Sequence, residues 1–284
     1  MLLLMITVLA LLSAVGVYFC GGLVAAVAAF IGGWIAWLIL AALLLMLACA
    51  VVDKEKEQEN DSAFYRWLVH LWLDFLICVG RVKIKTRGVE HIPGEGRFLL
   101  VCNHLCDIDP ALLMHCFPKS QLAFIGKKET KDMPLVGAVM HKLLCQYLNR
   151  ENDREALKTI LKCIQIVKDD KASIGLFPEG YVSLDGKLRH FRGGAFKIAQ
   201  KANVPVVVCT LQGSKRAMDR LLQLKPSEVE VHLVEIISAE EAKSMSSVEL
   251  GERVYESMIA DLGEEYRTNE KSMHPDLQRK MMEQ

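Results

Sequence analysis

Hydrophobic residues fill the start of the chain without interruption. From Leu2 to Val52 there is no Asp, Glu, Lys or Arg, and the run ends at the charged stretch 53–57. A single membrane-spanning helix needs about 20 apolar residues, and the apolar core of a signal peptide is about 7–15 residues long. The run exceeds both lengths, so the pattern predicts a hairpin of two membrane helices over residues 1–52.

Two glycine pairs offer the breaks that such a hairpin needs. Gly21-Gly22 and Gly32-Gly33 interrupt the run, which predicts one helix near residues 2–19 and another near 33–52. Because a hairpin returns to its starting side, the remainder of the chain lies on one face of the cell membrane. Basic residues further along favour the cytoplasmic face. They are Arg66, Arg81, Lys83, Lys85 and Arg87.

Residues 53–81 form a charged linker followed by a second apolar pattern. Apolar side chains recur there at helical spacing around one narrow polar stripe. Two interpretations stay open: a helix packed in a core on most sides, or a helix at the bilayer interface with Trp67 and Trp72 at headgroup level. The polar stripe consists of Arg66, His70 and Asp74.

From Val82 the pattern changes to short β-type runs that alternate with helical stretches, which is typical of an α/β domain. We expect one domain over residues 82–264, built as a mixed sheet flanked by helices, and a polar tail over 265–284. The expected strands are 82–85, 97–102, 122–126, 173–177, 205–211 and 228–236. The expected helices are 110–116, 135–144, 154–168, 194–201 and 248–262.

Composition narrows the function classes. With 52% hydrophobic residues the chain is more apolar than a typical soluble protein. The formal net charge is zero, so no nucleic acid partner is expected. The nine cysteines are scattered singly, without a C-x-x-C pair or a His/Cys cluster, which predicts reduced thiols and no metal site.

A histidine and an aspartate stand where a predicted strand meets a predicted helix. On one continuous helix, His104 and Asp109 would point about 140° apart and could not meet. With His104 at the end of the strand and Asp109 just before Pro110, the turn can fold the carboxylate onto the imidazole. Two roles stay open. Asp109 is a helix N-cap beside a loop histidine, or it orients His104 for general-base catalysis on a hydroxyl.

A second motif, Phe177-Pro178-Glu179-Gly180, ends another predicted strand. The proline-fixed turn presents Glu179 at the carboxyl edge of the sheet, where open α/β folds bind ligands. Alone it is only a turn signal, but the pair of motifs is specific. With N-H-x-x-x-x-D followed by F-P-E-G, the chain resembles the glycerolipid acyltransferases, and among them the bacterial lysophosphatidate acyltransferase family.

The resemblance extends over residues 82–211 in four ordered blocks. It implies the glycerol-3-phosphate acyltransferase fold, with His104 as the base and Asp109 as its orienting partner. The blocks read NHLCDID, then FIGKKE through PLVGAVM to YLNR, then GLFPEG followed by RGGAFKIA, and last VPVVVCTL. The implied substrate-binding residues are Asn103, Lys127, Arg150, Glu179, Gly180 and Arg192.

One departure from the family pattern concerns the acceptor headgroup. Family members commonly continue F-P-E-G with Thr-Arg-Ser, whereas this chain has Tyr181-Val182-Ser183 and so lacks the usual phosphate-binding arginine. An anionic headgroup needs charge-assisted donors, and the departure leaves another lyso-lipid open as the acceptor. The cations that could replace the arginine are Lys127, Lys128, Arg150, Lys187, Arg189 and Arg192.

The resemblance implies a membrane-bound O-acyltransferase of phospholipid biosynthesis. It would transfer a fatty acyl group from acyl-CoA or acyl-carrier protein to the sn-2 hydroxyl of 1-acylglycerol-3-phosphate, giving phosphatidic acid, without a further cofactor. Two alternatives stay open. One is a thioesterase with Cys102 or Cys106 as the nucleophile beside His104, and the other is a non-catalytic lipid-binding protein of the membrane in which His104 and Asp109 are structural.

Overall fold

A seven-stranded sheet in the order β1-β8-β7-β2-β5-β3-β4 forms the centre of the fold. The computed structural model describes all residues except 93, 150–151, 192 and 272–284. Neighbouring strands are parallel except for β7 and β8, so the sheet is mixed, as expected. The strands are β1 (Val82–Arg87), β2 (Leu99–Cys102), β3 (Leu122–Lys127), β4 (Gln146–Leu148), β5 (Ser173–Leu176), β7 (Val206–Gln212) and β8 (Ser227–Ile237).

Continuous apolar runs explain the middle of the sheet. Every residue of β2 and β5 is buried, as are Val206 to Leu211 of β7. Strands that are covered on both faces need apolar side chains on both, which is why these runs do not alternate. The carboxyl ends of β2, β5 and β3 therefore lie next to one another at one edge of the sheet.

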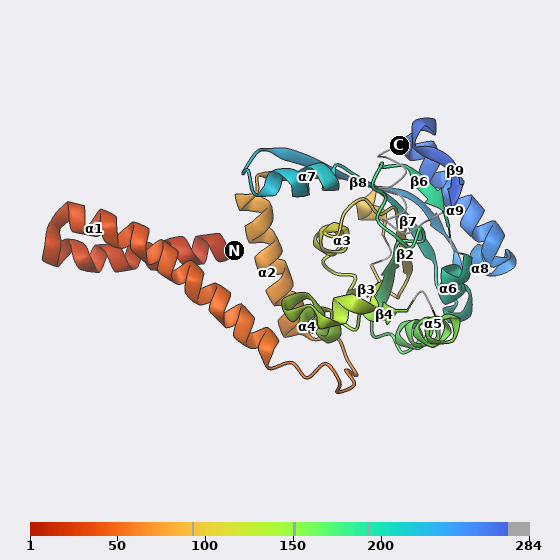
Figure 1. The fold of residues 1–284 in the computed structure, drawn as a ribbon, viewed down its shortest axis with the longest axis horizontal. Coiled ribbons are helices and arrows are strands. Elements are labelled where there is room, and N and C mark those ends of the chain that lie inside the picture. Colours follow the sequence, from red (N-terminus) through yellow and green to blue (C-terminus); the bar gives the residue numbers. More distant parts are fainter. Residues whose placement is uncertain (93, 150–151, 192, 272–284) are drawn as a thin grey trace.

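Helices cover both faces of the sheet (Figure 1). One side carries α2 (Ala63–Val79), α3 (Asp109–Cys116) and α4 (Pro134–Lys142), with α7 (Ser214–Leu221) beside the end of α2. The other carries α5 (Asp153–Lys168), α6 (Lys197–Ala202), α8 (Ala239–Ser244) and α9 (Ser247–Leu262). Short 3₁₀ turns occupy Val89–His91, Lys128–Asp132, Gly193–Phe196 and Glu264–Tyr266.

Five short elements were not expected from the sequence. They are β4, α7, α8, and the two strands of a small second sheet, β6 (Leu188–His190) and β9 (Arg267–Lys271). The strands β4 and β6 have three residues each and β9 has five, which is too short for the sequence to show a strand period. The residues of β9 are also all polar. Residues 267–271 thus form a strand inside the expected tail, of which residues 272–284 lie outside the described part of the chain.

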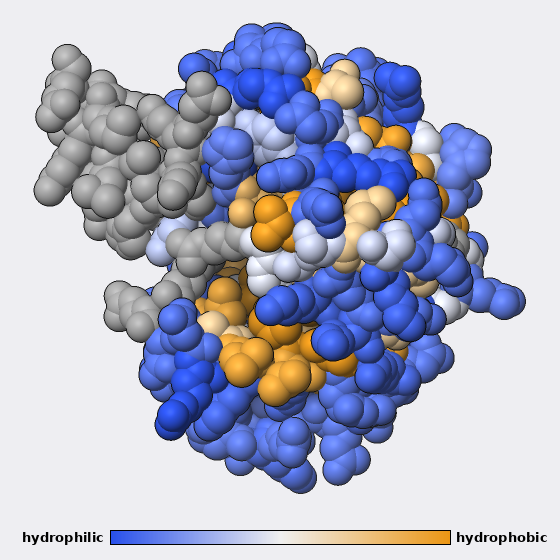
Figure 2. All heavy atoms as spheres, turned by 90° about the vertical axis from the view of Figure 1, so that its right-hand side faces the viewer, coloured by the Kyte–Doolittle hydropathy of each residue, from blue (hydrophilic) through white to orange (hydrophobic). Residues whose placement is uncertain are grey.

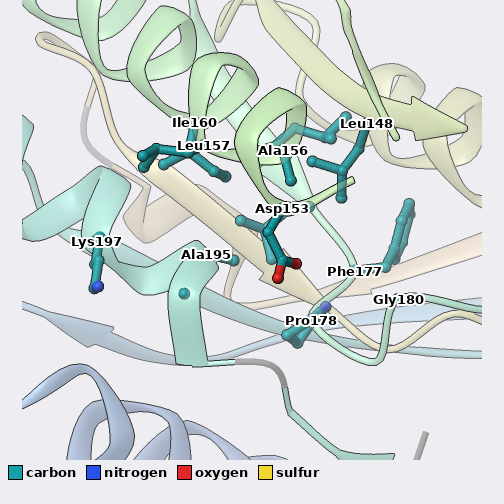
Figure 3. Close-up of a pocket in the computed structure, with 13 residues that line it drawn as sticks. Leu148, Asp153, Ala156, Leu157, Ile160, Phe177, Pro178, Gly180, Ala195 and Lys197 are labelled. Carbon is teal, nitrogen blue, oxygen red and sulfur yellow. The ribbon is translucent and has the colours of Figure 1, made fainter. Parts of the chain in front are cut away.

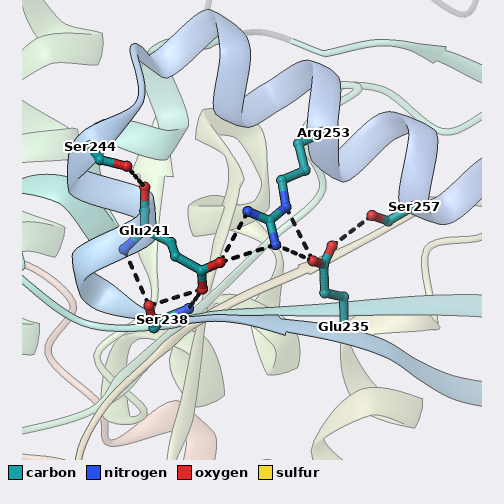
Figure 4. A network of polar contacts seen from close by, with 6 residues as sticks. All are labelled: Glu235, Ser238, Glu241, Ser244, Arg253 and Ser257. Carbon is teal, nitrogen blue, oxygen red and sulfur yellow. Dashed lines mark hydrogen bonds and ion pairs between the residues drawn. The ribbon is translucent and has the colours of Figure 1, made fainter.

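Polar contacts join the last two helices to the end of β8 (Figure 4). Arg253 of α9 donates to Glu235 at 2.5 Å and pairs with Glu241 of α8 at 3.4 Å. Ser257 also donates to Glu235, at 2.6 Å. Glu241 completes a capping box with Ser238, which satisfies amides at the start of α8. The network fixes the C-terminal helices against the sheet.

The apolar N-terminal segment is α1 (Leu2–Ala50), which is long and apolar enough to cross a membrane by length and composition. Its helical backbone is broken at Gly22, with φ 76° and ψ −172°, a conformation that glycine adopts without steric cost. The two parts lie against each other (Figure 1), and Trp34 Nε1 donates to Thr7 Oγ1 at 3.3 Å.

The second expected break in α1, at Gly32-Gly33, is absent. Helix continues through both glycines, so the part after Gly22 is longer than the expected 33–52. A Cβ on Gly33 would lie 3.6 Å from the Cα of Ala10. This is an ordinary van der Waals distance, so Gly33 faces the other part of α1 without being required there, and the glycine pair does not interrupt the helix.

The helix α2 joins α1 to the domain that contains the sheet. Its Leu71 and Phe75 pack against Leu2 and Ile6 of α1. On the domain side, Arg66 forms a buried ion pair with Asp61 at 2.6 Å and also donates to the Leu122 carbonyl. The stripe of polar residues therefore begins with a buried structural pair. Two aromatic side chains of α2 remain exposed, Phe64 and Trp67.

Candidate active site

His104 and Asp109 meet at the carboxyl end of β2. His104 Nδ1 lies 2.9 Å from Asp109 Oδ2. The same oxygen accepts the backbone N–H groups of Leu105 at 2.7 Å and Cys106 at 2.8 Å, and Asp109 is fully buried. Because an ionised carboxylate only accepts hydrogen bonds, it keeps the ring proton on Nδ1. The other ring nitrogen, Nε2, is left with its lone pair to act as a base.

The helix that follows begins one residue earlier than expected. Asp109 is itself the first residue of α3, Ile108 stands at the cap position without a side-chain bond, and Pro110 is second. Asp109 does not cap the helix, because its carboxylate turns back to the amides of residues 105 and 106. Of the two roles considered for Asp109, the geometry supports the contact with the imidazole and not the helix N-cap.

Glu179 is fully buried and links the loops after β2 and β5. Its Oε1 accepts the N–H of His104 at 2.9 Å, and its Oε2 accepts the N–H of Arg189 at 3.1 Å. The N–H of Ser183 also donates to the His104 carbonyl, at 2.8 Å. Burial raises the pKa of Glu179 to about 8, against the lowering effect of the two N–H donors. Glu179 thus holds the backbone of His104 in place.

Aromatic rings fix the plane of the imidazole. The rings of His104 and Phe177 are stacked with centroids 4.1 Å apart and planes 14° apart. Phe177 lies in turn near parallel to Phe124 of β3, at 5.8 Å. The imidazole is therefore held by a carboxylate at one nitrogen and by a ring on one face. The His104 side chain remains 13% exposed to solvent. Within the described part of the chain, no group hydrogen-bonds to Nε2.

Asn103 is buried and tied to backbone. Its side-chain amide donates to the Leu211 carbonyl at 2.9 Å and accepts the Leu211 N–H at 2.7 Å. These two bonds close the gap between the ends of β2 and β7, where ladder pairing stops. The side chain expected to bind substrate is thus occupied in positioning the residue before His104.

The candidate cations differ in their surroundings. Lys127 ends β3 at the same sheet edge as His104 and is half-buried. Arg189 is buried and pairs with Asp185 at 2.9 Å, and Lys187 is exposed. Arg150 and Arg192 lie outside the described residues. Of these cations, Lys127 thus lies at the sheet edge that holds His104 and Glu179. Arg189 is already engaged in an ion pair with Asp185.

An apolar pocket of about 350 Å³ lies beside Phe177 (Figure 3). It opens between α5 and the turn after β5, where Gly180 has a φ of 82°. Sequence reasoning did not identify it, because apolar residues on α5 carry the same helical pattern as core residues. The lining residues are Ile125, Leu148, Asp153, Ala156, Leu157, Ile160, Leu176, Phe177, Pro178, Gly180, Gly194, Ala195 and Lys197.

The pocket belongs to the side of the domain that carries α5. Figure 2 shows this side as mostly hydrophilic, with apolar side chains gathered in its lower half. Two leucines of α5 are exposed, Leu157 by 57% and Leu161 by 55%. Asp153 and Lys197 are the two charged residues of the lining (Figure 3). The pocket thus suits a mainly hydrocarbon ligand.

The cysteines near His104 do not form an activated nucleophile. Cys102 is fully buried, which raises its thiol pKa well above the ordinary value, and burial also raises the pKa of Cys106. A raised pKa lowers the fraction of reactive thiolate, which disfavours the thioesterase alternative. Among the residues that the structure describes, no group of three or more His, Cys, Asp and Glu side chains could hold a metal ion.

A second His–Asp contact lies elsewhere in the sheet. His232 Nδ1 of β8 is 3.1 Å from Asp261 Oδ2 of α9, and Thr210 of β7 donates to the same carboxylate. This cluster packs α9 on β7 and β8, level with the end of β2, and among the described residues none of its three side chains hydrogen-bonds to His104 or Asp109. It therefore provides an internal control for the pair at His104.

Comparisons with known proteins place this site in a family. A family model described as Acyltransferase matches residues 83–212. A probable 1-acyl-sn-glycerol-3-phosphate acyltransferase of Mycoplasma pneumoniae is 29% identical over 201 residues, which cover 68% of this chain and 74% of that protein. A chloroplastic 1-acyl-sn-glycerol-3-phosphate acyltransferase of Brassica napus is 32% identical over 156 residues, 55% of this chain and 44% of that protein.

A solved structure shares the fold. The crystal structure of the 1-acyl-sn-glycerophosphate acyltransferase from Thermotoga maritima matches with a TM-score of 0.54 at 23% identity, covering 81% of this chain and 98% of that one. The matched family region contains the ends of β2, β3 and β5, and so the whole His104 site. Residues 83–212, which carry this site, match the acyltransferase family model.

Proposed function

We propose that this protein is a membrane-anchored acyltransferase that converts 1-acyl-sn-glycerol-3-phosphate to phosphatidic acid. The observation that carries the proposal is the 2.9 Å contact between His104 Nδ1 and Asp109 Oδ2 at the sheet edge. It lies inside the region matched by the family model, and the relatives described above are named for this activity. Acyl transfer to a hydroxyl needs a general base, and the contact with Asp109 leaves Nε2 of His104 able to accept the hydroxyl proton.

The proposed reaction uses His104 as base and then as acid. Nε2 takes the proton of the sn-2 hydroxyl while the hydroxyl oxygen forms a bond to the thioester carbonyl carbon. The tetrahedral intermediate collapses by breaking its carbon–sulfur bond, and the imidazolium returns its proton to the leaving thiol. Asp109 stabilises the imidazolium between these steps. No acyl-enzyme forms, and no side-chain nucleophile is required.

Three further parts complete the proposed site. The donor is acyl-CoA or acyl-carrier protein, and the pocket beside Phe177 accommodates part of a hydrocarbon chain. Lys127, with Arg150 and Arg192, provides charge for the acceptor phosphate in place of the arginine that Val182 replaces. Glu179 and Asn103 act as positioning residues through the backbone contacts of the loops after β2 and β5.

The membrane anchor is α1, as a two-helix hairpin folded at Gly22. The part before Gly22 is about 30 Å long at 1.5 Å per residue, close to the hydrocarbon thickness of a bilayer. Exposed apolar side chains along α1, such as Phe19 and Val24, suit lipid contact. The catalytic domain then lies on the cytoplasmic face, and the acceptor reaches His104 from the bilayer.

A lyso-lipid panel tests the proposal. The purified full chain is incubated with labelled acyl-CoA and lyso-lipids that differ in headgroup, and products are identified by mass spectrometry. We expect acyl transfer to lysophosphatidate to give phosphatidic acid. Transfer only to an uncharged or zwitterionic lyso-lipid would contradict the proposed acceptor, and release of free fatty acid alone would contradict transfer to a lipid.

A further inference from the structure

The turn after α7 exposes apolar side chains to an unusual degree. Leu222 is 95% exposed, more than Val24 at 85% and Phe19 at 81% in the proposed membrane anchor. Leu224 is 52% exposed and Met218 42%. Single exposed apolar residues are common on soluble surfaces, but a group within one turn indicates a contact surface. We call Met218, Leu222, Leu224 and the adjacent cations Lys215, Arg216 and Lys225 the α7 patch.

The backbone at Leu224 gives an independent indication. The N–H of Leu224 donates to the Leu221 carbonyl at 3.1 Å and that of Lys225 to the Arg220 carbonyl at 3.4 Å. These two bonds form a Schellman motif, whose left-handed residue is usually glycine. Here it is Leu224, with a φ of 51°. An exposed leucine in this conformation costs conformational energy without a packing gain inside the domain.

The charge of the α7 patch is complementary to a phosphate surface. Its three cations, Lys215, Arg216 and Lys225, are all exposed. The single acidic side chain in residues 214–226 is Asp219, which pairs with Lys215 at 3.4 Å. Cations that flank exposed leucines match the headgroup layer of an anionic bilayer, where leucines enter the acyl boundary and cations contact phosphates.

The α7 patch continues the surface from which α1 leaves the domain. Val79 at the end of α2 belongs to the cluster that holds Leu2 and Ile6 of α1. The next residue, Gly80, touches Leu221 of α7, since an added Cβ would overlap its Cδ1. Figure 1 shows α7 beside this end of α2, on the same side of the sheet as α1.

From these observations we propose that the α7 patch is a second membrane contact, which seats the catalytic domain on an anionic bilayer. The inference rests on the proposed function, in which α1 anchors the protein in that membrane. With α1 alone the domain could tilt about the linker at 53–61. A second contact at α7 fixes its orientation, so that the sheet edge with His104 faces lipid-borne acceptor.

Acyl transfer to two acceptors tests the orienting role. The full chain is reconstituted in vesicles of phosphatidylcholine and phosphatidylglycerol and assayed with long-chain lysophosphatidate in the bilayer and with short-chain lysophosphatidate dissolved in water. For Leu222→Asp/Leu224→Asp we expect a loss of about tenfold or more with the bilayer acceptor, because two leucines no longer enter the interface. The rate with the dissolved acceptor stays within about twofold. Val248→Asp, at another exposed apolar position, leaves both rates unchanged.

Hydrogen exchange tests the contact without using turnover. Amides of residues 218–225 should exchange more slowly in vesicles containing phosphatidylglycerol than in phosphatidylcholine alone, and the difference should shrink at high salt. Equal exchange in both vesicles, or wild-type rates of the double variant with both acceptors, would overturn the second contact and leave the proposed function standing. Slower exchange without any acyl transfer would support the contact and contradict the proposed function.

Discussion

Phe177 lies face to face with His104 at 4.1 Å, so the first residue of the F-P-E-G motif covers one face of the imidazole that we propose as the base. Phe177→Ala removes that ring, and the imidazole gains freedom to leave its productive orientation. An aromatic contact of this kind contributes about 0.5–1.5 kcal/mol, so we expect kcat to fall about twofold to twelvefold. Steady-state kinetics of the folded variant measure it. Phe177→Tyr keeps the ring and should keep most of the activity.

Asp109→Asn tests the carboxylate partner. The amide can present its NH₂ group to Nδ1 and favour the wrong tautomer, and it cannot stabilise an imidazolium. General-base catalysis contributes about 10²–10⁴-fold, and we expect kcat to fall within that range with a smaller change in KM. Asp261→Asn, in the separate contact with His232, is the matched control. Equal losses in the two variants would indicate a shared structural effect.

Glu179 makes stability depend on pH in a defined direction. Burial raises its pKa in the folded protein to about 8 from an ordinary value of 4.5. The folded state therefore holds this proton more tightly, and the free energy of unfolding falls as pH rises from about 4.5 to about 8. Glu179→Gln lacks the titrating group. The Tm of Glu179→Gln minus the Tm of wild type should increase as pH rises from about 4.5 to about 8. A difference in Tm that does not change with pH would contradict the raised pKa of Glu179.

Cys106→Ser distinguishes acyl transfer without an acyl-enzyme from thiol catalysis. The raised pKa of this thiol makes it a poor nucleophile, and the proposed reaction does not use it. We expect kcat within about twofold of wild type and no acylated protein during turnover, by intact-protein mass spectrometry. A covalent acyl adduct on Cys106 that forms and decays at the turnover rate would contradict the proposed path.

The His104–Asp109 contact was predictable because it is local. Five residues, a proline and the end of an apolar strand restrict the turn enough to bring imidazole and carboxylate together. The role of Glu179 was less accessible, since its partners are backbone amides at His104 and Arg189 that only the tertiary fold places beside it. A motif shows that a carboxylate stands in a turn, but not which way the turn faces.

Non-local features were the ones missed. The pocket beside Phe177 takes its walls from α5, α6 and three strands, and the motif residues among them, such as Gly180, do not indicate in the sequence that apolar side chains of α5 lie opposite. The strand β9 is polar and depends on pairing with β6. Gly32-Gly33 was expected to break the helix, yet helix continues through both residues, and Gly33 faces Ala10 of the other part of α1. In each case distant contacts override what local residue preferences indicate.

The most direct test of the account is turnover by His104→Ala, because the proposed chemistry depends on Nε2 of this side chain. The variant is assayed for transfer of labelled acyl groups to lysophosphatidate beside His232→Ala, after both are shown to keep the wild-type Tm within about 2–4 °C. We expect kcat to fall about 10²–10⁴-fold in His104→Ala and to stay near wild type in His232→Ala. A folded His104→Ala protein that transfers acyl groups at the wild-type rate would contradict the account.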